Sequence, residues 1–229
     1  MIHLPFEDRV EAGRLLAREL SARGIVESGG AAVVLALARG GVPVGFEIAD
    51  RLHLPFDVIV VRKVGVPWQP ELAMGAISGQ VRILDDPMIR ELGISDADVE
   101  DIIAREQVEM KRREELYRAG QPALDLHGRS AILVDDGLAT GNTLLAAVRH
   151  VRSLDPGRIV IAVPVGSSTA CARLRGEVDD VVCLATPDHF CSVGEWYRDF
   201  EQVGDAEVRK LLAESRQQLR KHSGSAVVA

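Results

Sequence analysis

Two adjacent carboxylates, Asp135 and Asp136, stand directly after a short apolar run. Such a run is typical of a strand that is buried on both faces. Small or flexible residues follow at 137–143, with hydroxyls at Thr140 and Thr143, and apolar residues then recur at helical spacing. We therefore predict a strand, a loop and a helix, with the loop wrapped around the N-terminus of the helix.

The predicted loop suits the binding of a phosphate group. Free backbone N–H groups and the positive end of the helix dipole favour an anion, and small residues let it approach closely. The two carboxylates would repel a phosphate, so they need another partner, and vicinal ribose hydroxyls or a hydrated Mg²⁺ fit. A sugar phosphate satisfies both requirements. The alternative is a buried strand whose aspartates only cap the helix, which leaves the segment 140–143 unexplained.

The segment 134–143 reads Val-Asp-Asp-Gly-Leu-Ala-Thr-Gly-Asn-Thr. It resembles the phosphoribosyl-pyrophosphate (PRPP) motif of the type I phosphoribosyltransferases, and it is neither a Walker A loop nor a dinucleotide fingerprint. In that family the two acids hold the ribose hydroxyls and the loop holds the 5′-phosphate. The resemblance implies that PRPP is bound by Asp135, Asp136, Gly137, Leu138, Ala139, Thr140, Gly141, Asn142 and Thr143.

A second phosphate loop is expected at Ala38, Arg39, Gly40 and Gly41, where a buried strand turns into a helix. Taken alone this turn is weak evidence, because glycines are common between strands and helices. Its place in the chain matches the pyrophosphate loop of similar phosphoribosyltransferases, which often contains a cis non-proline peptide. The resemblance implies a cis bond between Ala38 and Arg39 and adds these four residues to the PRPP site.

Arg62 and Lys63 stand where the second strand should end. They could simply be solvated, but we favour Arg62 as a PRPP ligand and Lys63, together with Arg39, as a cation that neutralises the departing pyrophosphate. Residues 64–80 are rich in glycine and proline without clear periodicity, so we expect a long loop that closes over the substrates. Glu71 is its carboxylate and a candidate partner for a metal ion or a proton.

An aromatic-rich, irregular segment spans residues 186–204. It could be ordinary core, but we favour a cap over the site, the position of the hood in the resembled family. A ring stacked on a nucleobase would contribute about 1–3 kcal/mol. The candidates for that role are Trp196, Tyr197 and Phe190.

The resemblance implies a Mg²⁺-dependent transfer of the 5-phosphoribosyl group from PRPP to a nitrogenous base, purine or pyrimidine-like, with release of pyrophosphate. Asp135 and Asp136 would fix the ribose and hold Mg²⁺ together with the substrate, while Arg39 and Lys63 would stabilise the leaving group. The 6-oxopurine enzymes usually carry an aspartate before the Thr-Gly of the motif. This chain has Ala139 there, which argues against hypoxanthine or guanine as the acceptor.

Two other functions stay open. A non-catalytic module on the same fold could sense PRPP or a nucleotide, and a hydrolase could use water in place of the base. The acid pair together with Arg39 favours the transferase. The segments 38–41 and 71–76, combined with a long helix, also resemble a bacterial group whose members are named phosphoribosyltransferases without a demonstrated reaction.

Length, charge and cysteine content limit the number of domains, the possible partners and the cellular compartment. The 229 residues suffice for one domain, 1–229, and a net charge of −7 argues against a nucleic-acid partner. No apolar run approaches the ~20 residues of a membrane span, and the N-terminus does not resemble a secretory signal. Three cysteines without metal or redox spacing are expected to be reduced thiols in a cytoplasmic protein. The resemblance also allows a homodimer.

The order of the elements predicts an α/β fold with three α/β/α layers: a mainly parallel sheet of five to six strands, a small C-terminal hood and an inserted long helix. We expect the apolar stripe of that long helix to pack on the core, with a partner surface as the alternative. The tail 222–229 is expected to be disordered. The predicted helices cover 6–23, 42–52, 88–92, 96–118, 144–151, 169–174 and 205–221, and the strands 31–38, 56–61, 81–84, 131–134, 158–165 and 180–185.

Overall fold

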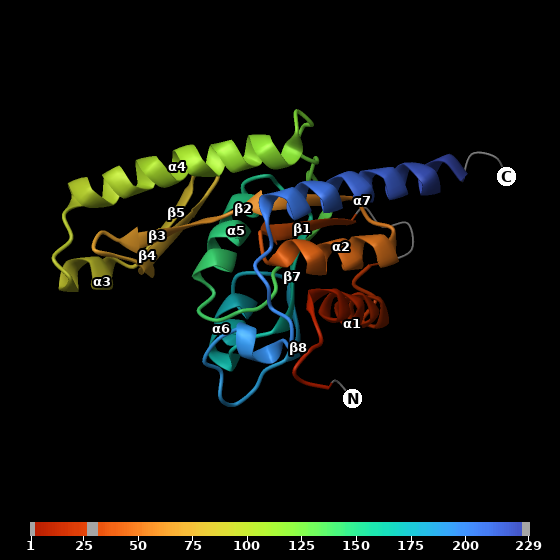
Figure 1. The fold of residues 1–229 in the computed structure, drawn as a ribbon, viewed down its shortest axis with the longest axis horizontal. Helices are drawn as coiled ribbons and strands as arrows, with labels where there is room; N and C mark the ends of the chain where they lie inside the picture. Colours follow the sequence, from red (N-terminus) through yellow and green to blue (C-terminus); the bar gives the residue numbers. More distant parts are fainter. Residues whose placement is uncertain (1–2, 27–31, 226–229) are drawn as a thin grey trace.

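Five of the apolar runs form one parallel sheet with the strand order β2-β1-β6-β7-β8. The computed structural model describes residues 3–26 and 32–225 (Figure 1). The sheet confirms the predicted α/β class with five strands, the lower of the two predicted numbers. Its strands are β1 (Ala32–Ala38), β2 (Phe56–Val60), β6 (Ser130–Val134), β7 (Arg158–Val165) and β8 (Asp180–Ala185).

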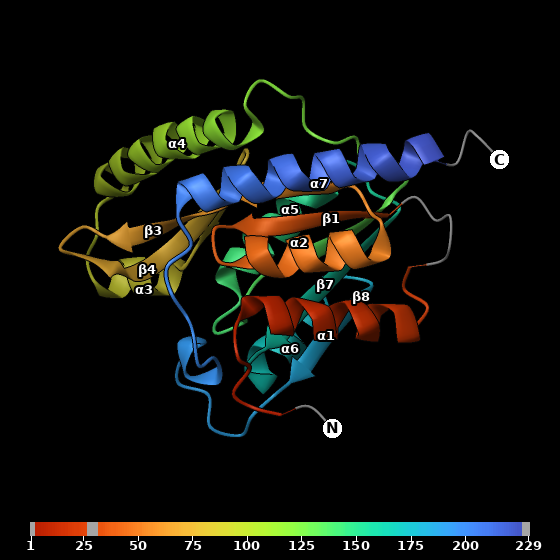
Figure 2. The same cartoon turned by 45° about the vertical axis from the view of Figure 1, so that its right-hand side comes forward.

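Helices cover both faces of this sheet (Figure 2). On one face lie α1 (Arg9–Ala22) and α2 (Gly41–Leu52), with α7 (Asp205–Ser225) packed on α2. On the other face lie α5 (Asn142–Arg152) and α6 (Ser168–Arg175). Alternate residues of β1 enter the two cores, because successive side chains of a strand point to opposite faces, and this explains its unbroken apolar sequence.

The prediction of a long loop at residues 64–80 is wrong. These residues belong to β3 (Arg62–Val66) and β4 (Gln69–Ser78), which pair in an antiparallel hairpin, and β5 (Val81–Leu84) completes a separate three-stranded sheet. The glycines that suggested a loop are needed by close strand contacts. A Cβ on Gly65 would lie 2.3 Å from the carbonyl oxygen of Pro70, and one on Gly75 would lie 2.5 Å from that of Ile83.

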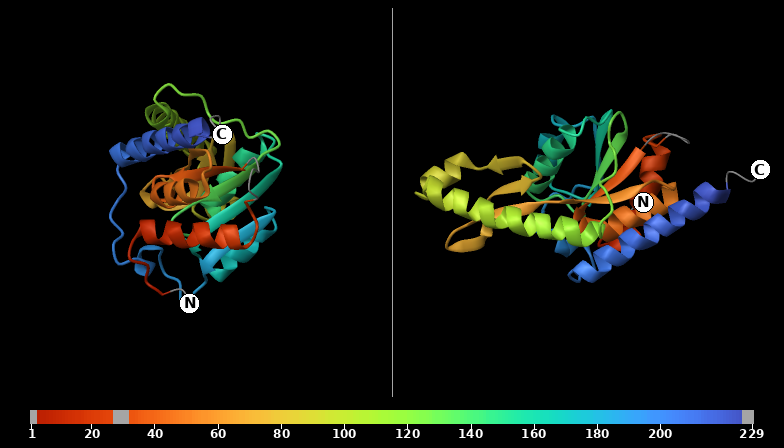
Figure 3. Two further views of the ribbon diagram at one scale, coloured as in Figure 1. Left: turned by 90° about the vertical axis from the view of Figure 1, so that its right-hand side faces the viewer. Right: turned by 90° about the horizontal axis from the view of Figure 1, so that it is seen from above.

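The long helix is confirmed as α4 (Asp96–Arg118), which begins at an N-cap formed by Ser95. It runs alongside the second sheet and reaches α7, and the short helix α3 (Asp86–Glu91) precedes it (Figure 3). Its predicted stripe is buried against the core, which supports the packing interpretation over a partner surface. The buried stripe comprises Val99, Ile103, Met110 and Tyr117.

The C-terminal region connects back to the N-terminus. Residues 186–204 are largely irregular, as expected, apart from the 3₁₀-helix η1 (Gly194–Trp196), and Phe6 forms a bridge with Tyr197. The last helix extends to Ser225, so 222–225 are helical, whereas the rest of the predicted disordered tail, 226–229, lies outside the described residues. All three cysteines are free thiols, and none of the helices that the structure describes is long and apolar enough to cross a membrane.

Candidate functional site

The loop 137–143 leaves the carboxyl end of β6 and leads into α5. Gly141 is the N-cap of α5 with a φ of 82°, and no side chain of the described residues caps this helix, so its first N–H groups stay available to an anion. The loop is fixed from the next strand connection, because the N–H of Leu138 donates to Val165 at 2.9 Å and Ser167 Oγ donates to the carbonyl of Ala139 at 2.7 Å. Thr140 is exposed at the surface of this loop.

The acid pair is held by two residues that sequence analysis did not place in this role. Arg9, the first residue of α1, contacts Oδ2 of Asp136 with Nε at 2.9 Å and with a second guanidinium nitrogen at 2.8 Å. The hydroxyl of Tyr197 donates to the carbonyl oxygen of Asp136 at 2.6 Å. The side chains of Arg9 and Asp136 are only 11% and 14% exposed, so this is a partly buried ion pair. No local pattern in the sequence links residues 9 and 136.

Burial dominates the electrostatics of both acids. It raises the pKa of Asp135 well above the ordinary value, and the neighbouring charge of Asp136 raises it further, against smaller opposing effects from Arg9 and Lys63. Burial also raises the pKa of Asp136, although Arg9 counteracts it. The carboxylate of Asp135 accepts the backbone N–H of Asp136, at 2.9 Å, but no cation of the described residues pairs with it. It is therefore the less compensated of the two acids.

The second predicted phosphate loop packs directly against the acid pair. The peptide bond between Ala38 and Arg39 is cis, as the family resemblance implies. A Cβ on Gly40 would lie 2.2 Å from Oδ2 of Asp136, and one on Gly41 would lie 2.5 Å from the carbonyl oxygen of Val134. Both glycines are therefore required by the close approach of the two loops.

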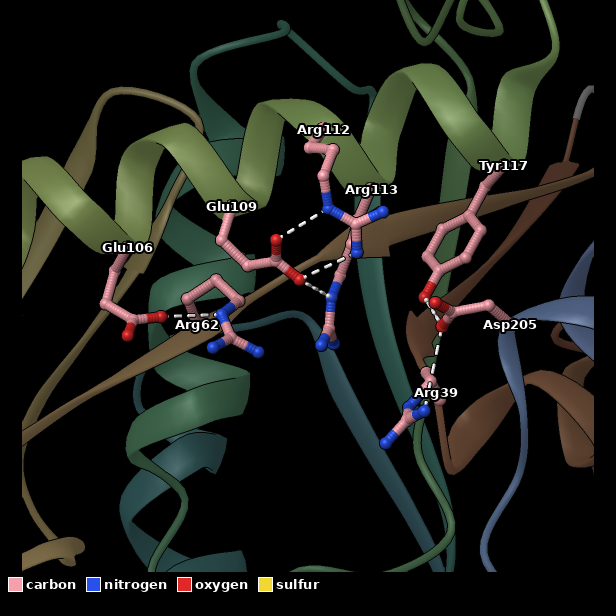
Figure 4. A network of polar contacts seen from close by, with 8 residues as sticks. All are labelled: Arg39, Arg62, Glu106, Glu109, Arg112, Arg113, Tyr117 and Asp205. Carbon is pink, nitrogen blue, oxygen red and sulfur yellow. Dashed lines mark hydrogen bonds and ion pairs between the residues drawn. The ribbon is translucent and has the colours of Figure 1, made fainter.

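Arg39 is oriented by α7 and α4. One of its guanidinium nitrogens lies 3.6 Å from Asp205, the first residue of α7, and the same carboxylate accepts the hydroxyl of Tyr117 at 2.7 Å (Figure 4). Partial burial and the hydrogen bond to Asp205 raise the pKa of Tyr117 to about 12, so the phenol keeps its proton at neutral pH. The contacts connect the loop 38–41 to the long helix, a link that the sequence did not predict.

A cleft of about 540 Å³ opens beside these loops, between α4 and the β3–β4 hairpin. Arg62 and Lys63 line it, as does Glu71, so the structure brings these predicted residues together with Ala38 and Thr143 of the two predicted phosphate loops. Arg62 is paired with Glu106 of α4 at 2.7 Å. The cleft is lined by Ala38, Val61, Arg62, Lys63, Gly65, Val66, Pro67, Pro70, Glu71, Ile102, Arg105, Glu106, Arg113 and Thr143.

The three aromatic candidates differ in their surroundings. Tyr197 is 5% exposed and packs against Phe6 and Phe200, so in this structure its ring supports the acid pair and is largely covered. Trp196 and Phe190 are stacked on each other with ring centroids 6.4 Å apart. Their role toward a base stays a prediction.

Comparisons with known proteins identify the family. The family model described as "Phosphoribosyl transferase domain" matches residues 9–199. Two proteins from strains of Mycobacterium tuberculosis, one named "Putative phosphoribosyl transferase Rv0571c", are 48% identical over 208 residues, which is 90% of this chain and 46% of theirs. The chain thus spans about half the length of these curated relatives.

A solved structure shows the same fold. The protein TT1426 from Thermus thermophilus is 42% identical, with a TM-score of 0.75 over 91% of this chain and 98% of that one. Because the family model covers most of the sequence and includes both predicted phosphate loops, the chain belongs to the phosphoribosyl transferase family.

Proposed function

We propose that the chain transfers the 5-phosphoribosyl group of PRPP to a nitrogenous base and releases pyrophosphate. One observation supports this most directly: residues of both phosphate loops, Ala38 and Thr143, line one cleft together with the cations Arg62 and Lys63. A compound that carries phosphate at both ends of a pentose needs such a pair of anion sites. The acid pair lies next to both loops. A ribose held by these acids would therefore lie between the two phosphate-binding loops.

Each part of the site then has a chemical task. The loop 137–143 binds the 5′-phosphate through backbone N–H groups at the start of α5. Asp135 accepts the ribose hydroxyls, since its carboxylate has few protein partners. Breaking the C1–O bond places negative charge on the departing pyrophosphate, which Arg39 and Lys63 stabilise. Fixing both ends of the sugar makes the attack of the base effectively intramolecular.

Mg²⁺ would bind at this site together with the substrate. No group of three or more metal-ligating side chains occurs within residues 3–26 and 32–225, so the site would hold Mg²⁺ with at most two protein carboxylates. Mg²⁺ commonly binds through one or two carboxylates together with substrate phosphates and waters. Asp136 is occupied by Arg9, so Asp135 is the carboxylate that would hold the ion, which would supply charge neutralisation of the pyrophosphate.

The acceptor is a purine or a pyrimidine-like base. Ala139 occupies the position where the resembled 6-oxopurine enzymes carry an acid, so we propose a base other than hypoxanthine or guanine. Trp196 and Phe190, in the segment 186–204, are the proposed stacking surface. We also propose that the protein is cytoplasmic, since its three cysteines lack metal or redox spacing, and that it works as a homodimer, on the resemblance to the family.

The test is incubation of the purified protein with PRPP, Mg²⁺ and a panel of bases, with pyrophosphate release as the signal. We expect release that requires one base of the panel. Asp135→Asn combined with Asp136→Asn should lower the rate at least ~100-fold, the usual cost of losing a group that stabilises the transition state. Glu91→Gln is the matched control, since Glu91 is an exposed acid of α3 that does not line the cleft.

The same assay separates the alternatives. Pyrophosphate release that needs no base would identify hydrolysis. PRPP binding without any turnover would identify a sensing module, and unchanged turnover in the double variant would contradict the role of the acid pair.

A further inference from the structure

The cleft beside the phosphate loops has a wall that the resembled motifs do not include. Helix α4 contributes Arg105 and Arg113 to the same cleft that Ala38, Lys63 and Thr143 line. Figure 4 shows Arg113 directed from the underside of α4 toward the side on which Arg62 and Arg39 lie. The long helix therefore presents guanidinium groups to the site as well as packing on the core.

The charges of this cleft do not cancel. Its lining contains four cations, Arg62, Lys63, Arg105 and Arg113, and two acids, Glu71 and Glu106, in a chain whose net charge is −7. The chain as a whole is negatively charged, so the need for solubility does not explain an excess of positive charge in this one cleft.

The pairing within the cleft shows which cations are available to a ligand. Glu106 neutralises Arg62, and Glu109 is shared between Arg112 and Arg113, each with a nitrogen at 2.7 Å. Hydrogen bonds from both arginines lower the pKa of Glu109 to about 2, so at neutral pH one carboxylate faces two guanidinium groups. This cluster keeps one unbalanced positive charge.

Two further cations have no acidic partner. In the part of the chain that the structure describes, no carboxylate lies within 4.0 Å of the Lys63 ammonium or of the Arg105 guanidinium, whose Nε donates to the carbonyl of Asp101 at 3.2 Å. Both side chains are exposed, so a ligand can reach them. Glu109 holds Arg113, whose side chain is 18% exposed, in a defined position.

We propose that Arg105 and Arg113 of α4 bind the pyrophosphate group of the activated sugar in the cleft that Ala38 also lines. The proposal rests on the proposed function and deepens it, because it assigns the leaving group to a wall supplied by the long helix. Pyrophosphate is compact and highly charged, and guanidinium groups match phosphate oxygens in geometry.

The probe for this site is inorganic pyrophosphate with Mg²⁺, measured by isothermal titration calorimetry. We expect Arg105→Gln to weaken binding at least 3-fold, and Arg105→Gln with Arg113→Gln at least 10-fold. Lys111→Gln removes the same charge from α4 at an exposed position outside the cleft, so it should change the affinity less than 2-fold. Arg105 pairs with no acid among the described residues, so its single variant should fold like the wild type even where the double variant does not.

Ribose 5-phosphate, which lacks pyrophosphate, serves as the second probe. Its affinity should be unchanged in both arginine variants, since it engages the loop 137–143 and Asp135 and carries no pyrophosphate for the α4 arginines to bind. Wild-type affinity for pyrophosphate in Arg105→Gln and in the double variant would overturn the inference, as would an equal loss in Lys111→Gln. If the wild type turns over PRPP but the arginine variants bind pyrophosphate as tightly as the wild type, only this inference fails. If the wild type binds neither probe, the proposed function fails as well.

Discussion

Arg9 is the residue whose removal tests our account of the site most sharply. Its guanidinium neutralises Asp136, lies 3.9 Å from the centre of the Phe200 ring, and donates to the carbonyl oxygen of Glu201 at 2.8 Å. In Arg9→Met the apolar part of the contact with Phe200 is kept. The carboxylate of Asp136 is then left without its cation, next to the second acid Asp135.

The expected cost follows from the burial of the pair. Breaking a buried ion pair by removing one partner costs about 3–5 kcal/mol. Both side chains retain some exposure, 11% and 14%, so we expect a loss of about 2–4 kcal/mol in the free energy of unfolding at pH 7. Arg14→Met is the control on the same helix. Arg14 is 50% exposed and pairs with Glu47 at 3.0 Å, so its loss should cost at most about 1 kcal/mol.

A double-mutant cycle separates the ion pair from the other contacts of Arg9. In the background Asp136→Asn the charge is gone, so Arg9→Met loses the cation–π contact, the hydrogen bond to Glu201 and a neutral hydrogen bond to the amide oxygen at position 136, about 1–2 kcal/mol in total. The coupling energy between residues 9 and 136 should therefore be about 1–2 kcal/mol.

The pH dependence has a defined sign. Burial already raises the pKa of Asp136 in the folded state, and the loss of Arg9 removes the main effect that lowers it. A carboxyl group with a raised folded pKa destabilises the fold above that pKa and has no such effect below its unfolded pKa of about 3.9. The penalty of Arg9→Met should therefore be complete at neutral pH and shrink as the pH falls toward about 4.

Urea denaturation followed by circular dichroism, at pH 7 and at the lowest pH where the wild type stays folded, measures these quantities. A loss no larger than that of Arg14→Met would refute the ion-pair interpretation. So would a penalty that grows as the pH falls, or a cycle without coupling.

Three further predictions concern the neighbouring contacts. Asp135→Asn removes the carboxylate whose burial is least compensated, so it should raise the free energy of unfolding by about 0.5–2 kcal/mol. The same variant should lower PRPP turnover ~100-fold. A melting temperature below that of the wild type would contradict the first expectation. Gly40→Ala should abolish PRPP binding in a calorimetric titration, because its Cβ would lie 2.2 Å from Asp136 Oδ2; retained affinity would show that the two loops separate easily. Asp205→Asn keeps a hydrogen-bond acceptor but loses the charge 3.6 Å from Arg39. The KM for PRPP should therefore change several-fold, and kcat should change less. If the free energy of unfolding and the rate fall together instead, Asp205 has a structural role only.

The sequence by itself determined the frame of the protein and the central loop. Apolar runs of strand length, separated by helical patterns, are governed by local periodicity, and they predicted a mainly parallel sheet of five to six strands and the long helix α4. The segment 134–143 predicted the loop at the N-terminus of α5 for the same reason: its small residues and its glycine at positive φ act locally.

Only the tertiary structure decided what surrounds that loop. Residues 64–80 became a hairpin because contacts with α4 and α5 outweigh their weak local preference, and their glycines serve close strand contacts. Arg9 reaches Asp136 across 127 positions of the chain, and Asp205 joins Arg39 to Tyr117 from the start of the last helix. A buried charge is stabilised by whichever opposite charge the fold brings next to it, and that distance is not encoded in any local pattern.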